Sequence, residues 1–265
     1  MAIFINDIPV EINRYPDGTF RIEFDMEKVE ESEGDYFVKW LYEPNEELPF
    51  YFAVKQLKLN TSRHKTIVLD MPYCPYARED KWVGYDRAFS LKFFSELINS
   101  LEFEEVWIED AHSSVCLALI DRAVDHKYYV HKVEKLIDKL KPELIFYPDQ
   151  GAYERYMKAI KIPEGVNTGF GIKLRDPYTG KITGYECDHF TNYNVLIVDN
   201  ICSKGTTYLL AAEQLKHHGH EIINLYCTHI ESSILEGELI KSGLLEKIYT
   251  TDSIWRGEHH LIEVL

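Results

Sequence analysis

Short apolar runs alternate with amphipathic helical stretches along most of this chain, and this alternation limits the fold more than any other feature. Near-continuous apolar runs are typical of parallel strands that are buried on both faces. The alternation therefore predicts an α/β fold with mainly parallel, doubly wound sheets. The expected strands are Thr66–Met71, Glu105–Glu109, Glu143–Tyr147, Val195–Val198, Glu221–Thr228 and Lys247–Thr250, and the expected helices are Asp86–Leu101, Ser113–Val124, Ala152–Ile160, Gly205–His218 and Ser232–Ser242.

Three of the expected strands end in an acidic residue that is followed by small or polar residues and then by a helix. The three segments read "WIEDAHSSV", "IFYPDQGAY" and "LIVDNICSKGTTY", and they contain Asp110, Asp149 and Asp199. In open α/β sheets, ligands bind beyond the carboxyl ends of the strands. The repetition predicts two related halves that present polar side chains to a phosphate and a metal ion.

The third of these segments has the clearest chemistry. A carboxylate at Asp199 can accept hydrogen bonds from ribose hydroxyls, although an acidic residue here can also be a plain helix cap. The loop Ser203–Thr207 then opens a helix whose free amides, threonine hydroxyls and Lys204 suit a phosphate. Its Gly205 lets the backbone come close to a ligand. An ordinary Ser/Thr-capped helix start is the alternative interpretation.

The overall composition excludes several classes of protein. The formal net charge of −15 argues against a nucleic-acid binder, because such proteins concentrate Lys and Arg. No apolar run approaches the roughly 18 residues that a membrane span needs, so no membrane association is expected. The five cysteines form no CxxC pair, which favours reduced thiols and a cytoplasmic location.

Six ordered motifs resemble those of the ribose-phosphate pyrophosphokinases, also called PRPP synthetases. The resemblance extends from about Ile12 to about Ile254. Six motifs in the family's order are far more specific than any one of them alone. They read "RYPDGTFRIEF", "MPYCPYARED", "EDAHSS", "YPDQGA", "IKLRDP" and "VDNICSKGTT".

The resemblance implies two tandem phosphoribosyltransferase-type (type I) domains, residues 1–128 on the ATP side and 129–265 on the ribose-phosphate side. It implies a Mg²⁺-dependent transfer of the β,γ-diphosphate of ATP to ribose 5-phosphate, giving PRPP and AMP. It also implies a homo-oligomer, in which the "YPDGT" turn completes the ATP site of a neighbouring subunit.

The resemblance carries roles to individual residues. Lys173 and Arg175 are the expected catalytic pair, on a hairpin that the Gly and Pro content also predicts. The expected magnesium ligands are His112 and Asp149. The expected ATP-binding residues are Tyr15, Asp17, Arg78, Glu79, Asp80 and His112, and the expected ribose-phosphate-binding residues are Asp149, Asp199, Asn200, Ser203, Lys204, Gly205, Thr206 and Thr207.

Departures from the family pattern leave other functions open. Asn200 replaces an acidic residue, Thr206 replaces a glycine, and Glu79 replaces a glutamine. Such departures resemble small phage members of the family, which would act in the host cytoplasm, some of them on ADP-ribose in NAD salvage. One alternative is therefore the same transfer of diphosphate from ATP, with ADP-ribose as the acceptor in place of ribose 5-phosphate. A phosphoribosyltransferase that consumes PRPP and a non-catalytic relative are the others.

Overall fold

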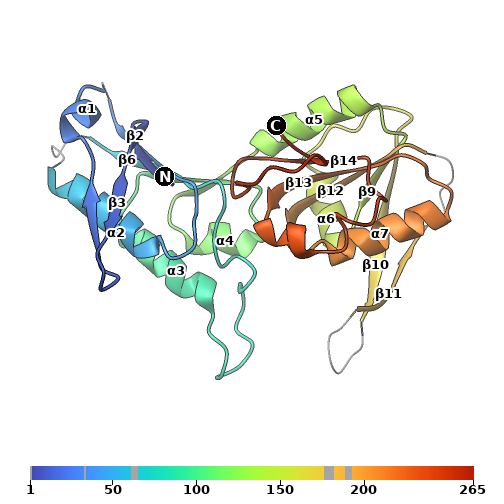
Figure 1. The fold of residues 1–265 in the computed structure, drawn as a ribbon, viewed down its shortest axis with the longest axis horizontal. Coiled ribbons are helices and arrows are strands. Elements are labelled where there is room, and N and C mark those ends of the chain that lie inside the picture. The colour runs from blue at the N-terminus through green and yellow to red at the C-terminus, as the bar shows by residue number, and fades with distance from the viewer. Residues whose placement is uncertain (1, 33, 61–64, 176–181, 189–192) are drawn as a thin grey trace. The chain divides into compact units, whose positions relative to one another are not determined.

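The computed structural model divides the chain into two compact units, Met1–His126 and Lys127–Leu265 (Figure 1). It describes every residue except 1, 33, 61–64, 176–181 and 189–192. Within the described part of the chain, no helix combines the length and the apolar character that a bilayer crossing requires.

The first unit is built on a six-stranded sheet in the order β2-β1-β5-β6-β7-β8. The strands β5 to β8 are parallel, and β1 and β2 add an antiparallel edge. A separate hairpin of β3 and β4 lies beside this sheet. The strands are β1 (Ile3–Ile5), β2 (Ile8–Pro9), β3 (Glu11–Arg14), β4 (Phe20–Glu23), β5 (Tyr36–Trp40), β6 (Ile67–Asp70), β7 (Glu105–Glu109) and β8 (Ala123–His126), and the helices are α1 (Met26–Glu30), α2 (Glu47–Asn60), α3 (Ser90–Asn99) and α4 (Ser114–Leu119).

Aromatic packing fixes the helices of the first unit on the sheet. Trp40 at the end of β5 stacks on Phe50 of α2, with ring centroids 4.0 Å apart, and both side chains are fully buried. Phe94 of α3 reaches the same indole ring. Burial of large aromatic side chains stabilises such a core strongly, so this contact anchors both helices.

The second unit has a seven-stranded sheet in the order β11-β10-β9-β12-β13-β14-β15. All neighbours are parallel except the β10–β11 hairpin. The elements are β9 (Leu144–Tyr147), β10 (Asn167–Arg175), β11 (Ile182–Cys187), β12 (Val195–Cys202), β13 (Ile223–Ile230), β14 (Lys247–Thr250), β15 (Ile262–Val264), α5 (Tyr128–Leu140), α6 (Gln150–Tyr156), α7 (Thr206–His217) and the short 3-10 helix η1 (Ser232–Glu236).

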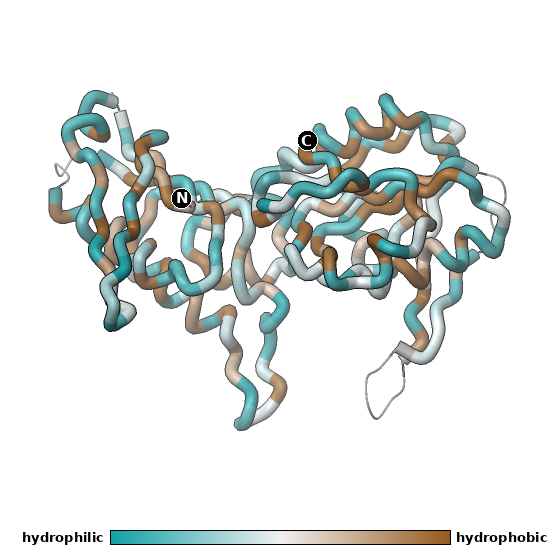
Figure 2. Tube along the Cα trace, in the orientation of Figure 1, coloured by the Kyte–Doolittle hydropathy of each residue, from teal (hydrophilic) through white to brown (hydrophobic). Residues whose placement is uncertain are grey.

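Both faces of this second sheet are covered. Val195 and Ile197 of β12 pack with α7, whereas Leu196 and Val198 pack with α5 and α6. This arrangement explains why β12 and β13 are near-continuous apolar runs, as expected for strands buried on both sides. Figure 2 shows these strands as largely hydrophobic and the outward sides of the helices as more hydrophilic. The predicted α/β fold with mainly parallel sheets is confirmed.

Several expected elements differ from the structure in their bounds. The expected helix Ser113–Val124 ends at Leu119, because Ile120 is already extended and the chain continues as β8. The expected helix Ser232–Ser242 is only the short η1. Asp199 does not end its strand, since β12 stays paired with β13 as far as Cys202 opposite Ile230.

Candidate active site

Asp149 lies at the end of β9 and begins α6. Its Oδ1 atom accepts a hydrogen bond from the backbone amide of Ala152 at 2.9 Å, which is ordinary N-capping. Its Oδ2 atom lies 2.7 Å from Nζ of Lys173 on β10. Burial raises the pKa of Asp149, but Lys173, the Ala152 amide and the charge of Arg155 together lower it below the ordinary value.

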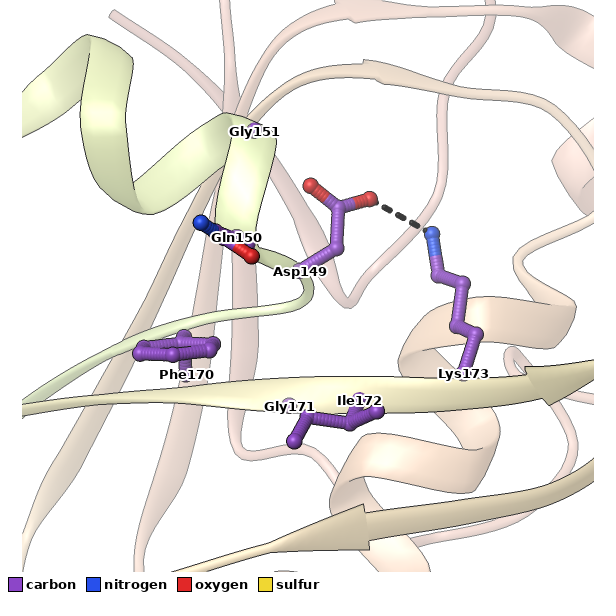
Figure 3. Close-up of a pocket in the computed structure, with 7 residues that line it drawn as sticks. All are labelled: Asp149, Gln150, Gly151, Phe170, Gly171, Ile172 and Lys173. Carbon is purple, nitrogen blue, oxygen red and sulfur yellow. Dashed lines mark hydrogen bonds and ion pairs between the residues drawn. The ribbon is translucent and has the colours of Figure 1, made fainter.

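A pocket of about 460 Å³ opens at this ion pair (Figure 3). It is formed by the start of α6 and by the adjacent part of β10, where Phe170 and Ile172 supply apolar surface. Figure 3 shows Lys173 extending from β10 toward Asp149. The antiparallel β10–β11 pairing confirms the predicted hairpin, and Arg175 is paired with Ile182. The side chain of Arg175 lies outside the described part of the structure.

A tyrosine that the sequence did not single out fixes the base of this hairpin. Tyr185 of β11 is buried and donates a hydrogen bond of 3.0 Å to the carbonyl oxygen of Pro148, next to Asp149. It crosses directly over Gly171, where an added Cβ atom would lie 1.9 Å from the tyrosine oxygen. Gly171 is therefore required for this close approach, which ties the hairpin to the end of β9.

Asp199 lies on β12, next to β9 in the sheet. Its carboxylate accepts hydrogen bonds from Tyr208 Oη and from the backbone amide of Asn200, both at 2.8 Å. Burial raises the pKa of Asp199 to about 6, against the lowering effect of these hydrogen bonds. Tyr208, on the inner face of α7, is a further residue of the site that sequence analysis missed.

Arg155 on α6 connects the two acidic residues electrostatically. Its positive charge lowers the pKa of both Asp149 and Asp199, while the Asp149 charge raises the pKa of Asp199. Glu154, the neighbour of Arg155 in the chain, accepts a hydrogen bond from Gln150. The site therefore contains two carboxylates with two cations, Lys173 and Arg155, around them.

The loop Ser203–Thr207 leads from β12 into α7. Gly205 has a φ of 81°, and a Cβ atom there would lie 2.6 Å from Leu239. Both facts require glycine at this position. Asn200, one strand residue after Asp199, is buried. The strand, the loop and the twelve-residue helix α7 have the order that the sequence predicted.

Two carboxylates lie against this loop, and the sequence pattern did not indicate them. Ser203 donates a hydrogen bond to Glu231, which follows β13, and Ser233 donates to the same oxygen. Lys204 pairs with Glu236 at 3.0 Å. Lys204, the one cation in the loop, is thus partly neutralised, and the loop together with Glu231 and Glu236 has one positive and two negative charges.

In the first unit, the segments expected to bind ATP follow neighbouring parallel strands. Arg78, Glu79 and Asp80 follow β6, and His112 follows β7. Glu79 makes a two-pronged ion pair with Arg87, in which Arg87 Nε and a terminal nitrogen lie 2.8 and 2.5 Å from the carboxylate oxygens. This pair holds the pKa of Glu79 below its ordinary value. Glu79 and Arg87 therefore hold together the two ends of the loop 79–87, a contact that the sequence did not predict.

Tyr15 and Asp17 lie in the turn of the β3–β4 hairpin. Asp17 Oδ1 accepts hydrogen bonds from the amide and the hydroxyl of Thr19, at 3.0 and 2.7 Å. The ring of Tyr15 is half exposed. In Figure 1 this hairpin projects as an arm separate from the loop before α3.

The described residues could supply only a few of the ligands of a Mg²⁺ ion. No group of three or more His, Cys, Asp or Glu side chains that could hold a metal occurs among them. Asp149 keeps lone pairs beyond those used by Ala152 and Lys173, since a carboxylate has about four acceptor sites. Mg²⁺ keeps several waters and takes few protein ligands when it is bound with phosphates. Asp149 alone, in the second unit, is compatible with a site of this kind.

Sequence comparison finds relatives that cover most of the chain. A ribose-phosphate pyrophosphokinase of Pyrococcus furiosus is 26% identical over 83% of this chain and 77% of its own length. One from Campylobacter jejuni is 25% identical over 92% of this chain and 78% of its own length. No protein-family model matches the chain.

Structural comparison extends the likeness to nearly the whole chain. A phosphoribosylpyrophosphate synthetase from Mycobacterium smegmatis superposes with a TM-score of 0.78 over 97% of this chain and 86% of the other, at 18% identity. This match shows the shared fold across both units. The predicted resemblance is confirmed by sequence, and the predicted fold is confirmed by structure.

Proposed function

We propose that this chain, which resembles the ribose-phosphate pyrophosphokinases in sequence and in fold, is a diphosphotransferase that uses ATP and a ribose phosphate. The anomeric oxygen of the sugar attacks the β-phosphorus of ATP and loses its proton. The bond between the β-phosphorus and the bridging oxygen breaks, and AMP leaves with that oxygen. Ribose 5-phosphate would give PRPP.

The observation that supports this proposal most is Lys173 at the pocket beside Asp149. In the reaction, negative charge develops on the transferred diphosphate and on the leaving AMP. Lys173 and Arg175, at the end of β10, would stabilise that charge, which is the main contribution a protein makes to phosphoryl transfer. Asp199 would accept hydrogen bonds from the ribose hydroxyls, and Ser203–Thr207 would hold the 5-phosphate.

Roles in the first unit complete the proposal. Arg78, Asp80 and His112 would bind the ATP phosphates, while Tyr15 and Asp17 would reach the nucleotide of a second copy of the chain. The active form would then be a homo-oligomer, at least a dimer. Mg²⁺ at Asp149 in the second unit, and Mg²⁺ at His112 in the first, would neutralise phosphate charge.

The test is an assay of nucleotide products with ATP, Mg²⁺ and ribose 5-phosphate. We expect AMP and PRPP in equal amounts, and no AMP when the sugar or Mg²⁺ is left out. Release of ADP would contradict the proposal, because it indicates transfer of the γ-phosphoryl group alone. Consumption of PRPP with a nucleobase, without ATP, would instead identify a phosphoribosyltransferase.

The charge of the phosphate loop favours ADP-ribose as a second candidate acceptor. The two negative charges of Glu231 and Glu236 beside the loop exceed the one positive charge of Lys204. A phosphate monoester dianion is therefore repelled there. The diphosphate of ADP-ribose carries less charge on each phosphorus atom. We expect Glu231→Gln to lower the KM for ribose 5-phosphate several-fold and to change the KM for ADP-ribose less. Equal changes for both sugars would remove this argument.

A further inference from the structure

The loop between β6 and α3 has a closed base and an exposed tip. Its base is the ion pair of Glu79 with Arg87, which joins two residues eight positions apart through two hydrogen bonds. Figure 1 shows this loop extending away from the body of the first unit. Such bidentate pairs fix geometry as well as charge, so the nine residues 79–87 form a defined structure.

The tip of this loop presents two aromatic rings to solvent. Trp82 and Tyr85 have ring centroids 6.0 Å apart at an angle of 85°, so they form a right-angled corner. Trp82 is 61% exposed and Tyr85 is fully exposed. Large aromatic rings gain most when they are buried, so an exposed and mutually arranged pair indicates a binding surface for a planar ligand.

The charges around this corner differ from those of the protein as a whole. Residues 78–87 contain Arg78, Lys81 and Arg87 against Glu79, Asp80 and Asp86, so the segment is neutral in a chain of net charge −15. Arg87 and Glu79 cancel one another in their ion pair. Lys81 is exposed and lies directly beside Trp82 in the chain. A planar ring that carries an anion, as in a nucleotide, matches this combination.

We propose that Trp82 and Tyr85 form a stacking platform for the nucleobase of the ATP donor, with Lys81 toward its phosphates. The proposal deepens the proposed function, on which it rests, because it assigns the base-recognition surface of the same ATP site. It also gives Glu79 a role: its carboxylate does not contact the base but holds the loop that presents the rings. Stacking tolerates any purine, so the platform gives affinity more than selectivity.

Tryptophan fluorescence tests the platform without any need for turnover. Trp40 and Trp255 are buried, whereas Trp82 is the most exposed of the four tryptophans, so a polar quencher such as acrylamide reports mainly on Trp82. We expect ATP and AMP to protect this emission from quenching. Inorganic triphosphate and ribose 5-phosphate, which lack a base, should give no protection. Protection by triphosphate equal to that by ATP would overturn the stacking proposal.

Variants provide the second measurement. Loss of one stacked ring should raise the KM for ATP about tenfold to a hundredfold in Trp82→Ala, while Trp82→Phe should keep most of the affinity. Phe93→Ala is the matched control, since Phe93 is 54% exposed on the neighbouring helix α3 and outside the platform. An unchanged KM in Trp82→Ala would overturn the proposal. So would a shift from dimer to monomer in light scattering with unchanged ATP binding, because the corner would then contact a second copy.

The two measurements separate failure of this inference from failure of the proposed function. If the wild-type protein forms AMP and PRPP but ATP leaves Trp82 unprotected, only the platform is wrong. If ATP protects Trp82 but no sugar yields AMP, the nucleotide platform stands and the diphosphotransferase proposal is wrong.

Discussion

The ammonium group of Lys173 lies 2.7 Å from a carboxylate oxygen of Asp149. The side chain of Lys173 is only 17% exposed, so this contact is better shielded than an ordinary surface ion pair. The residue expected to stabilise the transferred diphosphate is therefore paired with a residue expected to bind Mg²⁺. Occupation of Asp149 by a cation would compete with this pair and free Lys173 for the diphosphate.

Replacement of Lys173 by Ala tests the catalytic role. Loss of one charged donor in a site that excludes water should reduce kcat about a hundredfold to a thousandfold, with a small change in KM. Arg175→Ala should behave in the same way. Lys158→Ala, on the exposed side of the segment after α6, is the control and should keep normal rates. Near-normal turnover of Lys173→Ala would contradict the proposed mechanism.

The Asp149→Asn variant tests the ion pair through stability. Asn is an equally good N-cap, so the change removes mainly the charge. Since the pKa of Asp149 is lowered in the folded protein, its stabilising effect is present above the ordinary value of 3.8 and is lost as the pH falls through the folded pKa. We expect urea unfolding at pH 7 to show a loss of roughly 0.5–1 kcal/mol that shrinks as the pH falls below the ordinary value of 3.8. Asp138→Asn, in an exposed pair with Lys141, should show almost no loss.

Asp199 should have the opposite dependence on pH. Its folded pKa of about 6 lies above the ordinary 3.8, so the folded protein binds the extra proton and stability falls as the pH rises from about 4 to 6. Asp199→Asn cannot ionise, and relative to wild type it should gain roughly 1–3 kcal/mol over this range in urea unfolding. A constant difference across the range would contradict the assignment.

The same carboxylate should control sugar binding. If the ionised Asp199 accepts the ribose hydroxyls, kcat/KM for the sugar should rise through about pH 6. Tyr208→Phe removes a hydrogen bond that lowers this pKa, so the rise should move to higher pH. A profile that keeps its position in Tyr208→Phe would show that Asp199 is not the titrating group.

Two glycines with positive φ separate backbone strain from steric contact. Gly205→Ala places a Cβ atom 2.6 Å from Leu239 at a φ of 81°, whereas Gly243→Ala at a φ of 67° meets nothing within 4 Å. We expect a loss of about 1 kcal/mol for Gly243→Ala from strain alone. Gly205→Ala should lose about 2–3 kcal/mol in urea unfolding, because overpacking adds to the strain. Equal losses would mean that Leu239 moves aside freely.

The sequence by itself determined the fold class and the family resemblance. These depend on short-range patterns: apolar runs of strand length, helical spacing, and an acidic or small residue where a strand gives way to a helix. Asp149 and the loop at Gly205 were predicted on this basis, and Lys173 was predicted from the family resemblance. The strand at Asp199 was predicted too short, because Asp199 and Asn200 interrupt its apolar run, whereas pairing with β13 continues the strand to Cys202.

Only the tertiary structure decided which distant residues meet. Glu231, Tyr185, Tyr208 and Arg155 enter the site from elements that the sheet order brings together, and no local pattern distinguishes them from core or surface residues. Glu79 is the clearest case. Its position in the sequence indicated contact with a ligand, yet its carboxylate forms an ion pair with Arg87, eight residues later. Hydrogen bonds and ion pairs depend on angles and distances of a few ångströms, which the packing of both faces of a sheet fixes and the order of residues does not.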